Sequence, residues 1–296
     1  MNIDVFLTAK SAAGLAATTI TWYSRHLTPY QEFLQDDGGD LCDPDTVRRF
    51  LSDRRRLGLK PNSVDAYYRS LSAWYAFMAD EGRLSCANPM VRVKRPKRPR
   101  TSPRRVSAEQ YEALLESIPH GSWIDLRDRL FVQMLFLCGI RVSELVGLSV
   151  RDVDITARLL RVVGKGSKER LVPIYPSIGP ALLEYLLLRP PWDGPELLLS
   201  NDGAGGVRGR LTASGVRQRL RKLCTAAGVP YTNPHAFRHG LAMHLLNNGH
   251  ADMSLIQRIF GHAQITTTQR VYAEWITSGM ITAYDEAMQS AERRKQ

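Results

Sequence analysis

The sequence of 296 residues is short of cysteine and has no long apolar segment. Its four cysteines (Cys42, Cys86, Cys138 and Cys224) form no Cys-x-x-Cys pair, which argues against a zinc ribbon and a disulfide-rich scaffold. No apolar run approaches the ~18 residues that a membrane-spanning helix needs, and no secretory signal peptide is visible. These absences favour a cytoplasmic protein with reduced thiols and no membrane partner.

Acidic residues are also scarce relative to basic ones. Lys and Arg number 40 against 29 Asp and Glu, so the formal net charge is +11 and the isoelectric point is near 9.7. Such a balance favours a polyanionic partner, and nucleic acid is the first candidate. The acidic residues that could serve a metal-dependent nuclease have no distinctive spacing; they are Asp125, Asp128, Asp152 and Asp154. We therefore expect no metal site.

Residues 91–105 form the best domain boundary in the chain. Eight of these fifteen residues are Lys or Arg, three are Pro and none is acidic. Proline at this density blocks helix and central strand, and like charges keep the segment extended. We expect a domain over residues 1–90, a basic linker over 91–105 and a second domain over 106–296. The predicted DNA contacts of the linker are Lys94, Arg95, Lys97, Arg98, Arg100, Arg104 and Arg105.

Periodicity predicts a mainly α fold with one small β-hairpin. The first domain reads as all-helical, with aromatic residues at helical spacing over 61–78. After the linker, Ser107 and Gln110 resemble a capping box that begins a helix. Two strand-like runs, 159–163 and 170–174, flank the tip GKGSK, which includes Lys168. The tip lacks the GxxxxGK[ST] pattern of an ATP-binding loop, so the second domain is expected to be α+β without a nucleotide cofactor.

Six polar residues stand in distinctive short motifs of the second half. They are Arg141 in CGIRVSEL, Lys165 in GKGSK, His235 and Arg238 in HAFRH, His262 after Gly261, and Tyr272. The HAFRH motif follows the helix-start signal Asn-Pro, so its basic residues share one helix face near an N-terminus that favours anions. A zinc site of the HExxH kind is excluded because the glutamate is missing. Arginines, imidazoles and a lysine can surround one phosphate, and a tyrosine can attack it.

The order of these motifs resembles that of lambda-integrase-type tyrosine recombinases over nearly the whole chain. The resemblance is closest to the small two-domain Xer-type recombinases and simple phage integrases. It implies a SAM-like core-DNA-binding domain followed by a catalytic domain. It also implies a site-specific recombinase that cleaves and rejoins double-stranded DNA through a 3′-phosphotyrosyl intermediate, without metal or ATP. A homotetramer on paired sites, assembled through the C-terminal segment, is expected.

The same resemblance assigns roles to the motif residues. Arg141 and Arg238 would bind the scissile phosphate, and Tyr272 would be the nucleophile. Lys165 would be the general acid, His235 the proton acceptor and His262 a hydrogen-bond donor to the phosphate. Glu144 and His239 would support the site. The interval from His262 to Tyr272 is one residue longer than is usual in Xer-type members, and Tyr284 is the rival nucleophile.

Three other functions stay open on the sequence. A type IB topoisomerase shares this chemistry, a DNA-binding regulator could share the fold without cleavage, and a metal-dependent nuclease would need a carboxylate cluster. The sequence also leaves open whether the reaction serves phage integration, transposition or chromosome-dimer resolution.

Overall fold

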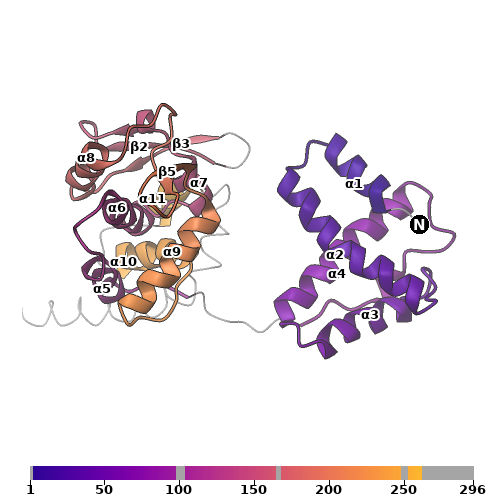
Figure 1. The fold of residues 1–296 in the computed structure, drawn as a ribbon. Helices are drawn as coiled ribbons and strands as arrows, with labels where there is room; N and C mark the ends of the chain where they lie inside the picture. Colours follow the sequence, from indigo (N-terminus) through magenta and orange to yellow (C-terminus); the bar gives the residue numbers. More distant parts are fainter. Residues whose placement is uncertain (1–2, 98–103, 165–167, 248–252, 262–296) are drawn as a thin grey trace, which may run out of the picture. The chain divides into compact units, whose positions relative to one another are not determined.

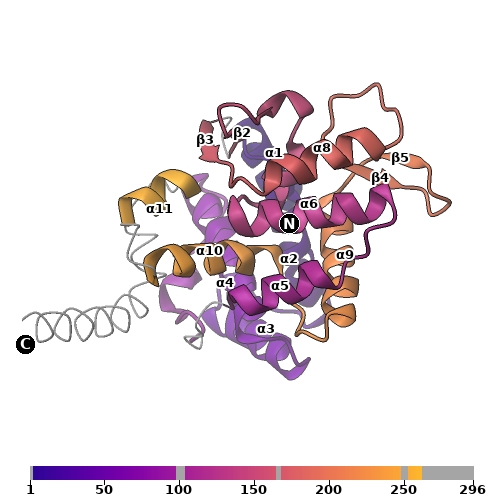
Figure 2. The same ribbon diagram turned by 90° about the vertical axis from the view of Figure 1, so that its left-hand side faces the viewer.

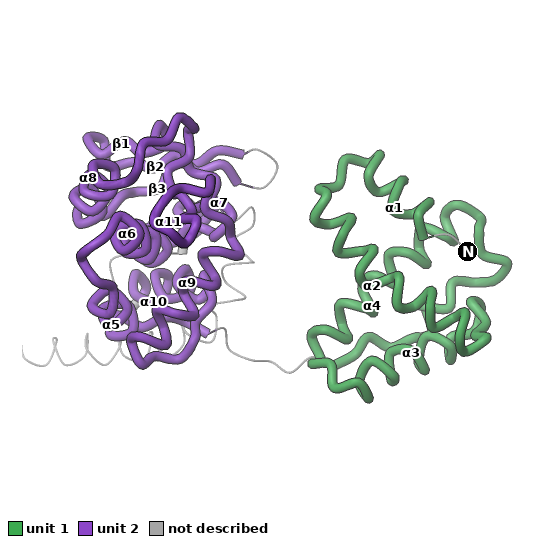
Figure 3. The backbone as a smooth tube through the Cα atoms, viewed as in Figure 1, with its two compact units in different colours: residues 1–101 green, residues 102–296 purple. Residues whose placement is uncertain are grey.

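The computed structural model describes residues 3–97, 104–164, 168–247 and 253–261. The chain divides into two compact units, residues 1–101 (unit 1) and residues 102–296 (unit 2), shown in Figure 3. The elements are mostly helices with small antiparallel sheets (Figure 1), which confirms the predicted fold class. Within the described ranges, no helix is both long and apolar enough to cross a membrane.

Unit 1 is helical throughout its described elements. These are α1 (Ile3–Ala12), α2 (Ala17–Asp36), α3 (Pro44–Arg56), α4 (Pro61–Asp80) and the 3₁₀ helix η1 (Pro89–Arg92). Proline occupies the first position of α3 and α4, where its missing N–H costs nothing. The core is aromatic: the Tyr30 and Phe50 rings meet edge to face at 4.9 Å, and the hydroxyls of Tyr30 and Tyr75 are 2.7 Å apart. The aromatic residues of α4 are therefore largely core residues.

The cysteines of unit 1 correct one prediction. Cys42 and Cys86 are joined by a disulfide, so the expectation of four reduced thiols is wrong for this pair. The two residues are 44 positions apart, and the fold brings the α2–α3 connection beside the segment after α4. Sequence spacing could not reveal this proximity. Cys138 and Cys224 are free and buried.

Unit 2 contains the remaining elements. They are α5 (Ala108–Glu116), α6 (Trp123–Leu137), α7 (Val142–Gly147), η2 (Val150–Asp152), β1 (Val153–Asp154), β2 (Leu159–Val163), β3 (Glu169–Pro173), α8 (Ile178–Leu188), β4 (Leu199–Asn201), β5 (Val207–Arg210), α9 (Ala213–Ala226), α10 (Pro234–Asn247) and α11 (Met253–Phe260). The capping box of Ser107 and Gln110 is present at the start of α5.

Helix α6 is the centre of unit 2. It contacts α5, α8 and α10, and Figure 2 shows it between α8 and α10. Its buried residues include a polar pair, because Arg127 donates to Asp128 and to the carbonyl oxygen of Leu199. Arg219 of α9 also pairs with Asp128. The side chains of Arg127 and Asp128 are 1% and 0% exposed, so this pair satisfies buried charges and connects α6 to α9.

The predicted hairpin forms part of a three-stranded antiparallel sheet in the order β1-β2-β3. Leu159 pairs with Pro173 and Val163 with Glu169, so the turn lies over the glycine-rich segment. Leu160, Val162 and Val172 are buried on one face, as strand alternation requires. A second hairpin, β4–β5, was not predicted because its strands are short and polar.

Candidate active site

Arg141 lies in a tight turn before α7. Gly139 has φ +60°, and a Cβ atom there would come within 2.7 Å of Phe260 and 2.8 Å of Leu241. Only glycine fits this turn without displacing both side chains. Arg141 then occupies the N-cap of α7, where its backbone N–H donates to Glu144 at 2.7 Å. Its side chain is 37% exposed, so the guanidinium reaches the surface while Glu144 holds it in place.

Arg238 lies on α10 and is only 2% exposed. Its Nη1 donates to the carbonyl oxygen of Gly139 at 2.8 Å, and its Nη2 donates to the carbonyl oxygen of Phe260 at 2.6 Å. The guanidinium also lies over the Phe260 ring, 3.9 Å from its centroid. Arg238 therefore connects the turn that carries Arg141 to the C-terminal end of α11, and the fold brings the two predicted arginine motifs together.

His235 lies in the first turn of α10. Asn233 caps this turn, because its Oδ1 accepts from the N–H groups of His235 and Ala236 at 2.9 and 3.2 Å. A cavity of about 370 Å³ opens here. Its lining comes from the start of α7, from α9 and from the start of α10: Arg141, Val142, Ser143, Arg217, Asn233, Pro234 and His235. The His239 ring packs edge to face on that of His235, with centroids 4.8 Å apart.

Burial and two nearby arginines together set the protonation of His235. Its pKa lies below the ordinary value of 6.5, because the surrounding protein displaces water from the ring and because Arg238 and Arg141 are positive. The imidazole is therefore neutral at neutral pH and can accept a proton. A neutral imidazole next to two arginines suits a reaction in which a hydroxyl group loses its proton.

Glu144 is the buried acid of the site, with a side chain only 4% exposed. Burial alone would raise its pKa, but hydrogen bonds from Arg170 and Arg141 outweigh that effect and lower the pKa to about 2. Its Oε1 accepts from Arg141 Nη1 at 2.8 Å. The supporting role expected of Glu144 came without a named partner; the structure pairs Glu144 with Arg141 and also with Arg170 of β3, which the sequence did not indicate.

Three of the six motif residues lie outside the described residues. These are Lys165, His262 and Tyr272; the structure describes the chain up to Gly164 and again from Lys168, and up to Gly261. Lys168 is exposed, and its carbonyl oxygen accepts from the Gly164 N–H at 2.8 Å, which closes the base of the hairpin tip. The predicted C-terminal oligomerisation segment also lies outside the described ranges.

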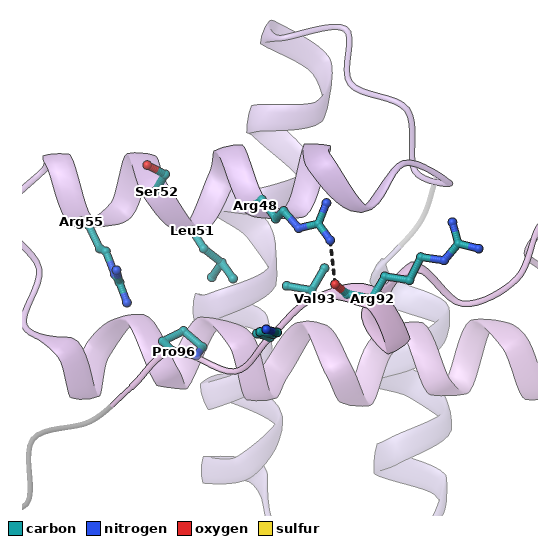
Figure 4. Close-up of a pocket in the computed structure, with 8 residues that line it drawn as sticks. Arg48, Leu51, Ser52, Arg55, Arg92, Val93 and Pro96 are labelled. Atoms are coloured by element: carbon teal, nitrogen blue, oxygen red, sulfur yellow. Dashed lines mark hydrogen bonds between the residues drawn. The ribbon is translucent and has the colours of Figure 1, made fainter.

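The basic segment after η1 runs along α3 in unit 1, and Figure 4 shows the cavity between them. The cavity measures about 450 Å³ and has four cationic and no acidic lining residues: Arg48, Leu51, Ser52, Arg55, Arg92, Val93, Lys94 and Pro96. Arg48 Nη2 donates to the carbonyl oxygen of Arg92 at 2.7 Å. The cavity therefore suits a polyanion.

The predicted linker contacts divide into two kinds. Arg95 is bound by the buried carboxylate of Asp65, with Nε–Oδ1 and Nη2–Oδ2 distances of 2.6 and 3.1 Å. Its guanidinium is thus held within unit 1 by Asp65, a carboxylate that also pairs with Arg69. The exposed residues among the other predicted contacts are Lys94, Lys97, Arg104, Arg105 and Lys168. Arg98 and Arg100 lie outside the described residues.

Comparison with known proteins agrees with this arrangement. The model of the phage integrase family matches residues 104–276. Tyrosine recombinase XerC of Chromohalobacter salexigens is 34% identical over 299 residues, which cover 99% of this chain and 97% of that protein. Tyrosine recombinase XerC of Rhodospirillum centenum is 39% identical over 203 residues, covering 67% of this chain and 58% of that protein.

Solved structures support the fold. XerA recombinase is 26% identical, with a TM-score of 0.55 over 96% of this chain and 97% of that one. XerH bound to palindromic difH substrate in a post-cleavage complex has a TM-score of 0.75 at 22% identity, over 93% of this chain and 81% of that one. The fold and the matches define the class: the protein is a tyrosine-type site-specific recombinase, an enzyme that breaks and rejoins DNA strands. Within that class, the chain belongs to the phage integrase family.

Proposed function

We propose that this enzyme recombines paired DNA sites by transferring a scissile phosphate onto Tyr272. The observation that supports this proposal most directly is the cavity that Arg141 and His235 share, together with Arg238 at the turn behind Arg141. Arginine suits a phosphodiester because a planar guanidinium can donate two parallel hydrogen bonds to the phosphate oxygens. A lambda integrase dimer has been solved bound to its core site, and that complex provides the analogy for a DNA partner.

The proposed reaction conserves the number of phosphodiester bonds. The Tyr272 hydroxyl oxygen attacks the phosphorus, and the bond from phosphorus to the 5′-oxygen breaks, which leaves a 3′-phosphotyrosyl link and a 5′-hydroxyl. His235 accepts the tyrosine proton, and Lys165 donates a proton to the leaving 5′-oxygen. Arg141, Arg238 and His262 stabilise the charge on the phosphoryl oxygens. The 5′-hydroxyl of a partner strand reverses these steps and completes the exchange.

The partner is double-stranded DNA, held by phosphate contacts from both units. The cavity beside α3 in unit 1 offers Arg55, Arg92 and Lys94 to the DNA backbone, and Lys168 adds charge at the base of the hairpin tip. Such contacts position the protein on the duplex without reading its sequence. The assembly is a homotetramer on two paired sites, joined through the C-terminal segment.

A covalent-trapping experiment tests this function. A duplex selected from a random-sequence pool by binding to the protein is nicked at successive positions, so that a short 5′-hydroxyl fragment diffuses away after cleavage. We expect a denaturant-stable protein–DNA adduct at a 3′ end, in EDTA as in its absence. DNA binding without an adduct would indicate a regulator, and EDTA-sensitive cleavage without an adduct would indicate a nuclease. Supercoil relaxation without strand exchange would indicate a topoisomerase.

The rate of adduct formation should depend on the protonation of His235. Because the pKa of His235 is below 6.5, the rate should be flat near neutral pH and fall as the pH decreases through that pKa, where the ring can no longer accept a proton. His235→Gln should slow the reaction by about 10²-fold and remove this acidic limb. The measurement is single-turnover cleavage from pH 5 to 8. His244→Gln, a change on the same helix, is the control: it should keep the wild-type rate and the wild-type acidic limb. An acidic limb that persists in His235→Gln would rule out this role.

A further inference from the structure

The side chain of Arg170 on β3 donates three hydrogen bonds, and no motif role accounts for this residue. Its Nη1 and Nη2 donate to Oε1 and Oε2 of Glu144, both at 2.9 Å, in a two-pronged ion pair. Its Nε donates to the carbonyl oxygen of Ile259 at 2.9 Å. The side chains of Arg170 and Glu144 are 12% and 4% exposed. One guanidinium thus bridges β3, α7 and α11.

The neighbouring Gly261 keeps room for this guanidinium. Gly261 has φ +61°, and a Cβ atom there would lie 2.8 Å from Arg170 Cδ. The position therefore favours glycine for both its conformation and its space. Gly261 precedes His262 in the chain, so Arg170 holds the end of α11 at the point where the predicted phosphate ligand begins.

The second hairpin arginine differs in its environment. Arg161 of β2 also forms two ion pairs, with Asp152 and Glu169, but its side chain is 50% exposed. Such exposed pairs contribute little to structure. Arg170 instead shares the inward face of β3 with Val172, since residues two apart in a strand point the same way. A charged side chain on the buried face of a strand needs a partner there, and Arg170 has one in Glu144.

The charges explain why Glu144 needs a second arginine. A buried carboxylate paired with Arg141 alone would cancel the charge that the scissile phosphate requires. With Arg170 added, the cluster of two guanidinium groups and one carboxylate carries a net charge of +1. Arg170 also occupies both carboxylate oxygens, while Arg141 uses one Nη and keeps a 37% exposed side chain at the cavity.

We infer that Arg170 is a positioning residue for phosphate activation. It holds Arg141 in place through Glu144, and it fixes the hairpin and the end of α11 relative to α7. This inference rests on the proposed function, because it concerns the site that activates the scissile phosphate. Arg170 itself does not touch the DNA. It acts by setting where Arg141 points and by balancing the charge of Glu144.

The test compares Arg170→Lys and Arg170→Gln with Arg161→Lys as the matched control. At saturating DNA, we expect adduct formation to slow by about 10-fold in Arg170→Lys and about 10²-fold in Arg170→Gln, since small displacements of a catalytic group have effects of this size. Lysine restores the charge but not the two-pronged geometry, so its rescue should be partial. DNA affinity should stay within about twofold. Arg161→Lys should match the wild type.

A double-mutant comparison separates positioning from general loss of structure. Glu144→Gln alone should also slow adduct formation. Adding Arg170→Gln to it should lower the rate by less than a further factor of about three, because both changes break the same Arg170–Glu144 ion pair. If the two penalties multiply instead, Arg170 does not act through Glu144. A rate for Arg170→Gln equal to that of Arg161→Lys would also overturn the inference.

A measurement without DNA keeps the inference testable if the proposed reaction fails. Selective ¹³C labelling of glutamate carboxyls reports the titration of Glu144. In Arg170→Gln its pKa should rise from about 2 toward or above the ordinary value of 4.5, because burial then has one less opposing arginine. In Arg161→Lys it should not move. An unchanged pKa in Arg170→Gln would overturn the coupling, whereas absence of an adduct from wild type would overturn the proposed function alone.

Discussion

Tyr272→Phe should abolish covalent attachment of the protein to DNA while leaving DNA binding intact. Phenylalanine lacks the hydroxyl oxygen that attacks the phosphorus, so the covalent intermediate cannot form. We expect adduct formation to fall by at least about 10⁴-fold, the scale on which removal of a nucleophile acts. The measurement is adduct formation on the nicked duplex under single-turnover conditions, with DNA affinity measured in parallel.

Tyr284→Phe is the matched control for this experiment. It removes a second tyrosine hydroxyl from the C-terminal region of the sequence, and it should leave both adduct formation and affinity unchanged. The comparison is informative because the sequence offers both Tyr272 and Tyr284 as candidate nucleophiles. An adduct that survives in Tyr272→Phe and disappears in Tyr284→Phe would reassign the nucleophile.

Local patterns in the sequence predicted the elements that carry the site. The capping box at Ser107 and Gln110, the helix start at Pro234 and the hairpin around the glycine-rich tip all occur in the structure. Each depends on residues a few positions apart, whose side chains meet through backbone geometry alone. The contact of Arg141 with Glu144 is also local in the chain, because Arg141 caps α7 and Glu144 follows three residues later.

Contacts between distant segments were missed for a physical reason. The disulfide of Cys42 with Cys86, the ion pair of Arg170 with Glu144 and the bond of Arg238 to Gly139 all depend on tertiary packing. One signal was present in the sequence, because alternation in β3 places Arg170 on the face of Val172. A charged residue on a buried strand face needs a partner, although the sequence does not say which one.

Arg238→Lys should also slow adduct formation strongly, because the guanidinium of Arg238 has both a structural role and a proposed catalytic role. Arg238→Lys keeps the positive charge but loses the stacking on Phe260 and the paired bonds to the carbonyl oxygens of Gly139 and Phe260. A buried lysine could reach at most one of these groups. We expect the rate of adduct formation at saturating DNA to fall on the order of 10²–10³-fold, as when one preorganised donor is removed from an oxyanion site.

Loss of stability could imitate this effect, so a second buried arginine is the control. Arg127 is 1% exposed and bonds to Asp128 and the Leu199 carbonyl oxygen, outside the cavity that holds Arg141 and His235. Arg127→Lys and Arg238→Lys should each lower the free energy of unfolding by about 1–3 kcal/mol, measured by denaturant titration. Only Arg238→Lys should slow cleavage per folded molecule. Equal cleavage rates in the two variants would mean that Arg238 serves folding alone, and the phosphate would then depend on Arg141 without a second guanidinium.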